Sequence, residues 1–140
     1  MKTKKLKKII SGYKQSSPED QVLMIEGRNA EEVLRAYVKH SGLCKEAQFK
    51  MLEMPNALQL LDIYSQRYWL SKEAEMKMLE HQKAPDLLKM YAKRRRLSFE
   101  AQEHILDVPN SLKLREIYGS RRNFCERFYV ALYERNHKEN

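Results

Sequence analysis

The chain has few of the residues on which most catalytic and metal sites depend. Its 140 residues include only four glycines, two cysteines, four histidines and one tryptophan. The glycines are scattered, so they form no phosphate-cradling loop, and no serine lies in a nucleophile-elbow sequence. The sequence has no Cys-x-x-Cys and no two histidines at the i, i+4 spacing of a helical metal pair. We therefore expect a protein that is not an enzyme and that has no catalytic residues, cofactor or metal.

Long apolar runs are also missing. The segment Met1 to Tyr13 has only three aliphatic residues after Met1, which is not the pattern of a signal peptide. Nothing later in the sequence approaches the apolar length of a membrane span. We therefore expect a cytoplasmic protein. In that reducing compartment we expect no disulfide between Cys44 and Cys125, which stand 81 residues apart.

The positive charge is concentrated at the start of the chain. The net charge is +8, and the first 14 residues hold six lysines and no acidic residue. These are Lys2, Lys4, Lys5, Lys7, Lys8 and Lys14. The other residues are nearly balanced, with 21 basic (27 minus 6) against 19 acidic side chains. This balance favours an acidic partner: nucleic acid, an anionic membrane surface or an acidic protein.

An internal repeat is the main feature that the sequence does contain. Four tyrosines stand 27 residues apart: Tyr37, Tyr64, Tyr91 and Tyr118. The residues around them repeat in the same register, and a degenerate copy precedes the first tyrosine. A period between about 20 and 50 residues is typical of solenoids, whose units bury their apolar faces against each other.

Each repeat contains two short apolar segments with helical spacing, which predicts a pair of antiparallel helices. We predict an all-α fold, an α-solenoid of stacked antiparallel helix hairpins with about ten short helices. Serines precede the first helix of a pair and asparagines the second, so we expect both to act as N-caps. The serines are Ser17, Ser71 and Ser98, and the asparagines are Asn29, Asn56 and Asn110. We expect one domain over 1–140, with a basic arm or helix at 1–15, repeats at 16–122 and a C-terminal capping helix and tail at 123–140.

The consensus of the repeat is Tyr-x5-Leu-Ser/Cys-x-Glu-Ala-x4-Leu-Glu-x-Pro-Asn-Ala-x2-Leu-Leu. It resembles the short α-helical hairpin repeats of uncharacterised bacterial repeat proteins and is similar in organisation to HEAT-like and tetratricopeptide arrays. The resemblance covers about residues 16 to 122. It implies an α-solenoid and carries over no activity or functional residue.

Carboxylates recur along the repeats in two rows. One row is Glu26, Glu53, Glu80, Asp107 and Glu134, and the other is Glu19, Glu46, Glu73 and Glu100. They could form an acidic track for a basic peptide. The alternative is structural, because acids near the amino end of a helix stabilise its dipole. The tyrosines likewise could stack a ligand, although their spacing is typical of core residues with the hydroxyl at the rim.

Cations and aromatic residues follow each repeated tyrosine, where the second helix ends. We name them the basic edge: Lys39, Arg67, Tyr68, Trp69, Lys93, Arg94, Arg95, Arg96, Arg121 and Arg122. Such a strip could hold a nucleic-acid backbone, with Trp69 stacking on a base. Cations at helix carboxyl ends also stabilise the dipole without any ligand.

Two functions therefore stay open. The first is a non-enzymatic scaffold that binds a protein or peptide, the commonest use of helical repeats. The second is a nucleic-acid-binding module that uses the basic edge.

Overall fold

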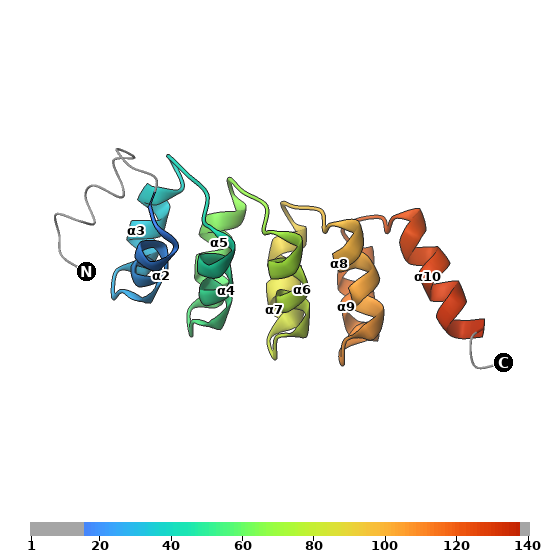
Figure 1. Cartoon of the computed structure of the whole chain (residues 1–140). Coiled ribbons are helices and arrows are strands. Elements are labelled where there is room, and N and C mark those ends of the chain that lie inside the picture. The colour runs from blue at the N-terminus through green and yellow to red at the C-terminus, as the bar shows by residue number, and fades with distance from the viewer. Residues whose placement is uncertain (1–15, 138–140) are drawn as a thin grey trace. The chain divides into compact units, whose positions relative to one another are not determined.

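A computed structural model describes residues 16–137 (Figure 1). Within this range it contains nine α-helices, one 3-10 helix and no strand. The chain divides into two compact units, Met1–Ser71 and Lys72–Asn140. The prediction of an all-α solenoid of stacked hairpins is confirmed. The basic arm predicted at 1–15 and the last three residues of the predicted tail lie outside the described residues.

The first unit consists of two helix hairpins. Its elements are α2 (Pro18–Glu26), α3 (Ala30–Tyr37), α4 (Lys45–Glu53) and α5 (Ala57–Ser65). Helix α2 packs on α3, and α4 packs on α5. The first helices of the hairpins, α2 and α4, lie side by side, as do the second helices, α3 and α5 (Figure 1). The unit is therefore a layer of first helices on a layer of second helices.

The second unit repeats this arrangement and adds a last helix. Its elements are α6 (Lys72–Glu80), α7 (Ala84–Ala92), α8 (Phe99–His104), the 3-10 helix η1 (Ile105–Asp107), α9 (Ser111–Gly119) and α10 (Glu126–His137). Helices α6, α8 and α10 pack in series as first helices, while α7 packs beside α9. The helix predicted at the C-terminus is α10.

The caps differ between the two kinds of helix. Ser17 and Ser98 accept hydrogen bonds from the backbone N–H groups of Asp20 and Ala101, each at 3.2 Å. The prediction of side-chain caps by Asn29, Asn56 and Asn110 was wrong, since none of these side chains bonds to its own helix. Their φ is near −100° and ψ near 32°, whereas a capping side chain needs an extended backbone to reach the first turn.

The core lies between the two layers of each unit. The small residues Ala47, Ala74 and Ala101, one in each of α4, α6 and α8, are completely buried. The repeated tyrosines are core residues, at most 2% exposed. The prediction that their hydroxyls lie at the rim was wrong. The Tyr64 and Tyr118 hydroxyls instead accept hydrogen bonds from backbone N–H groups, each at 3.1 Å.

A row of buried polar side chains ties each first helix to the loop that follows its hairpin, and the sequence analysis missed it. We name it the glutamine row: Gln21, Gln48, Glu75 and Gln102, all at most 6% exposed. Each side chain accepts a hydrogen bond from the backbone N–H 23 residues later, at 2.7 to 2.9 Å. The three glutamines also donate to the carbonyl five residues earlier, at 2.9 to 3.1 Å. For Gln48, Glu75 and Gln102 the sequence signal is a Gln or Glu directly after the repeated alanine, whereas Gln21 follows Asp20.

In the part of the chain that the structure describes, no helix has both the length and the hydropathy needed to cross a membrane.

Candidate functional site

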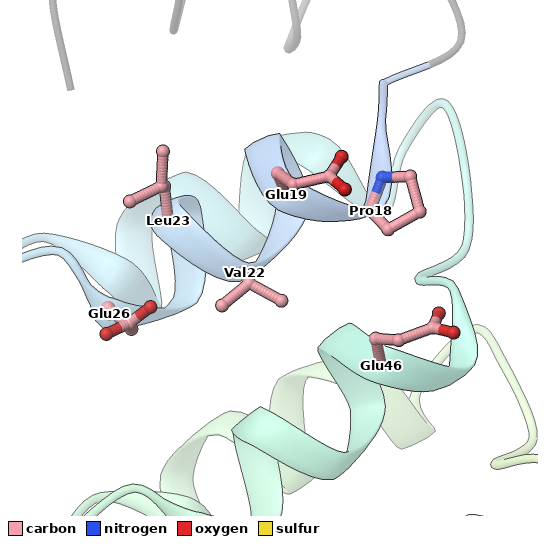
Figure 2. A pocket seen from close by; sticks show the side chains of 6 residues that line it. All are labelled: Pro18, Glu19, Val22, Leu23, Glu26 and Glu46. Atoms are coloured by element: carbon pink, nitrogen blue, oxygen red, sulfur yellow. The ribbon is translucent and has the colours of Figure 1, made fainter.

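An open pocket of about 430 Å³ lies on the exposed face of α2 in the first unit (Figure 2). We name it the α2 groove, and its lining residues are Pro18, Glu19, Val22, Leu23, Glu26 and Glu46. Five of them belong to α2 and recur at i, i+1, i+4, i+5 and i+8, which places them on one side of a helix. The sixth, Glu46, comes from the first turn of α4.

The floor of the groove is apolar. Leu23 is 48% exposed, although it belongs to a helix whose next two residues, Met24 and Ile25, are in the core. In Figure 2, Leu23 points away from α4 and Val22 points toward it. The groove thus presents Leu23, which no neighbouring first helix covers within the described residues, beside the half-buried Val22.

Carboxylates surround this apolar floor. Glu19, Glu26 and Glu46 are all exposed, with Glu19 and Glu46 in the first turns of their helices. A nearby cation is Lys50, whose ammonium lies 3.9 Å from both Glu26 and Glu53. Exposed ion pairs of this kind contribute little to stability. Three carboxylates against one nearby cation give the lining of the groove a net negative charge. The apolar floor and the acidic rim together suit a ligand that has an apolar face and positive charges beside it.

The acidic rows also form ion pairs between neighbouring first helices of the second unit. Glu80 lies 2.8 Å from His104, and Glu100 lies 3.7 Å from Arg127, which also donates at 2.7 Å to Glu103, a residue outside the two rows. Asp107 accepts from Arg135 at 2.7 Å, and this hydrogen bond holds the pKa of the Asp107 carboxyl below its usual range. This use of the carboxylates, as partners of the next first helix, was not among the predicted ones.

The first unit holds four residues of the basic edge at the ends of α3 and α5. Lys39 and Arg67 are exposed, and Trp69 is 58% exposed. Tyr68 is half-buried because its ring stacks on the core residue Tyr64, with ring centroids 5.4 Å apart. Tyr68 is therefore partly a core residue.

The second unit holds the other six residues of the basic edge, at the ends of the packed helices α7 and α9. Lys93, Arg94, Arg96 and Arg121 are exposed, while Arg95 and Arg122 are half-buried. The Arg122 Nε donates to the Ala92 carbonyl at 3.1 Å, at the carboxyl end of α7. Arg122 thus has the helix-end role that the sequence analysis left open as an alternative.

A second pocket, of about 360 Å³, lies between α7 and α9. Its lining residues are Pro85, Asp86, Lys89, Lys113, Ile117, Ser120 and Arg121. Three cations against one carboxylate give this pocket a positive field. It includes Arg121 of the basic edge and two lysines that the sequence analysis did not single out.

Glu75, Cys44 and Tyr64 have raised pKa values, and none of them lines either pocket. Burial raises the pKa of Glu75, but this carboxyl faces the hydroxyl of Tyr91 at 2.7 Å and lines neither pocket. Burial also raises the pKa of the Cys44 thiol and raises the pKa of Tyr64 to about 12. Among residues 16–137, no group of three or more histidine, cysteine or acidic side chains could hold a metal ion.

Comparison with protein-family models, with curated proteins and with solved structures finds no match to this chain. The resemblance to bacterial helical-hairpin repeats stays a prediction, and the function is argued from the two pockets.

Proposed function

We propose that the protein is a non-enzymatic scaffold that binds a protein or peptide segment in the α2 groove. The single observation that supports this function is the exposed aliphatic surface of α2, formed by Val22 and Leu23 inside a rim of carboxylates. Exposed apolar surface that is rimmed by polar groups is typical of interaction sites.

The shape of the groove favours a polypeptide over a small molecule. Small-molecule sites enclose most of the surface of their ligand, whereas this pocket is open along one side of a helix. Helix α2 has nine residues, so the groove extends over about 13 Å at 1.5 Å per residue. A ligand that runs along this face can contact Val22 and Leu23 at once, as helical ligands do in apolar grooves.

The proposed function predicts that a polar residue at position 23 removes binding. Peptides are first selected from a random library on the immobilised full-length protein, and their affinities are measured by fluorescence anisotropy. We expect Leu23→Gln to weaken the selected peptides about tenfold or more, since a central apolar anchor is lost. Glutamine is a good helix former, so α2 should persist, which circular dichroism checks.

The matched control is Leu58→Gln. Leu58 is also an exposed leucine of the first unit, but it lies on α5, outside the groove. This variant should bind the peptides as the parent does. Equal binding by the parent and the Leu23→Gln variant would rule out the groove as the binding site.

The pocket between α7 and α9 supports a second candidate function, nucleic-acid binding. Lys89, Lys113 and Arg121 could neutralise successive phosphates, which gives affinity that is independent of sequence and sensitive to salt. Arg96, Lys93 and Arg94 follow the same helix α7 and extend the positive surface.

This second function predicts that reversing Arg96 and Arg121 to glutamate removes binding of labelled single- and double-stranded nucleic acid. These two residues are exposed, whereas Arg122 bonds to α7 and its replacement would also disturb the fold. Anisotropy over about 50 to 200 mM salt should show a steep loss of affinity for the parent. If parent and variant bind alike, the pocket is not a phosphate site.

A further inference from the structure

Three ion pairs between first helices share one spacing, whereas Glu100–Arg127 and Asp107–Arg135 are 27 and 28 residues apart. In each of the three the earlier helix supplies the carboxylate and the next first helix supplies the cation 24 residues later. The pairs are Glu26 with Lys50, Glu80 with His104, and Glu103 with Arg127. First helices within a unit therefore stack with acid on the leading helix and base on the following one.

Helix α2 departs from this spacing at one position. Leu23 stands where α4, α6 and α8 have Lys50, Lys77 and His104, and α10 likewise has an apolar residue there, Ala131. Glu19 is not a departure, because Glu46, Glu73 and Glu100 occupy the same repeat position and only α10 has a cation there, Arg127. The side of α2 that an earlier first helix would cover is thus apolar at Leu23 and acidic at Glu19, and in the described residues no helix covers it.

We propose that the α2 groove receives a cationic amphipathic helix of another protein, which lies along α2 over Leu23 and Val22. This inference rests on the proposed function and specifies its partner. Apolar side chains of the ligand contact Leu23 and Val22, and lysines or arginines on both flanks face Glu19, Glu26 and Glu46. Pairing of cations on the ligand with carboxylates of the groove increases specificity and the rate of association more than it increases affinity.

A second copy of this chain fits the groove less well. The last first helix is α10, whose Glu134 occupies the repeat position of Glu26 and Glu80. Stacked on α2 with the same 24-residue spacing, Glu134 would face Leu23, and a carboxylate loses hydration against an apolar side chain. Val130 of α10 would face Glu19 and offer it no cation.

The test uses three labelled synthetic helices of about 15 residues with leucines at helical spacing and lysine, glutamine or glutamate on the flanks. The full-length protein should bind the lysine helix at least about tenfold more tightly than the glutamine helix and should not bind the glutamate helix measurably. This preference should shrink as salt rises through about 50 to 200 mM.

Two triple variants separate local from overall charge. Glu19→Gln, Glu26→Gln and Glu46→Gln together should weaken the lysine helix about tenfold, because three favourable charge contacts are lost. The control changes three exposed glutamates elsewhere, Glu32→Gln, Glu116→Gln and Glu126→Gln, and alters the net charge equally. It should retain affinity within about twofold.

Several results would overturn the inference. Equal binding of the lysine, glutamine and glutamate helices would overturn it. If Leu23→Gln still weakened all three helices in that case, the proposed function would stand, but the partner would not be cationic. Tighter binding after all six lysines of residues 1–14 are changed to serine would mean that the chain's own arm occupies the groove. A dimer that becomes monomeric in Leu23→Gln would mean that a second copy does.

Discussion

The hydroxyl groups of the repeated tyrosines are buried hydrogen-bonding groups. Tyr118 is fully buried, and its hydroxyl accepts the N–H of Leu97 in the loop before α8 at 3.1 Å. Tyr64 bonds to Leu43 in the same way, 21 residues earlier. A buried N–H that lost this acceptor would stay unsatisfied, since water does not reach it. The repeat therefore needs tyrosine at this position and not merely an aromatic ring.

We predict that Tyr118→Phe lowers the free energy of unfolding by about 1 to 3 kcal/mol, the cost of an unsatisfied buried N–H. The ring contact with Phe124 should persist, because phenylalanine keeps the ring. Urea denaturation measures the change. Tyr133→Phe is the control, since Tyr133 is 63% exposed, and it should change stability by less than about 0.5 kcal/mol. A similar effect of both substitutions would contradict this role of the hydroxyl.

At the scale of the element, α6 carries the one carboxylate of the glutamine row, Glu75. Gln48 and Gln102 both accept and donate at this position. The Glu75 carboxylate accepts from the Ser98 N–H at 2.9 Å and from the Tyr91 hydroxyl at 2.7 Å, and it has no proton to donate. Burial raises its pKa above the usual range, and the nearby Glu100 raises it further.

We predict that Glu75 makes stability depend on pH. The folded chain binds the proton of the Glu75 carboxyl more tightly than the unfolded chain does. The stability that this protonation contributes is therefore fully present below the ordinary glutamate pKa of about 4.3. It is lost as the pH rises through the raised pKa of folded Glu75. Glu75→Gln should remove this dependence and stabilise the protein by about 1 to 3 kcal/mol at neutral pH, because it removes a buried charge. Urea denaturation across a pH series tests this, and identical pH profiles for parent and variant would contradict it.

The helices themselves were predictable because the 27-residue period and the apolar spacing recur from repeat to repeat. The hydrogen bonds at the connections between helices were harder to predict. The asparagine caps failed because turn geometry, which composition does not reveal, decides whether a side chain reaches the first turn. The sequence shows Gln48 and Glu75 at the same repeat position, each directly after an alanine. Their burial could not be predicted, because each bonds to a backbone N–H that lies 23 residues later in the chain.

At the scale of the whole chain, the two candidate surfaces were predictable to different degrees. The basic edge was identified by its residue types, yet half-buried Tyr68 and Arg122 take part in the fold. The α2 groove was not identified as a site, although an acidic track for a basic peptide was one interpretation of its glutamates. The missed signal is Leu23, an aliphatic residue at a repeat position that holds Lys50, Lys77 and His104 in the next three repeats.

The most direct test of the account is a chemical-shift titration of the isotope-labelled full-length protein with the lysine helix. The account predicts that the largest backbone amide changes fall at residues 19–26 of α2 and around Glu46 of α4, and that they vanish in Leu23→Gln. The largest changes around Arg67 to Trp69, or between α7 and α9, would contradict it and would assign the binding surface to the basic edge.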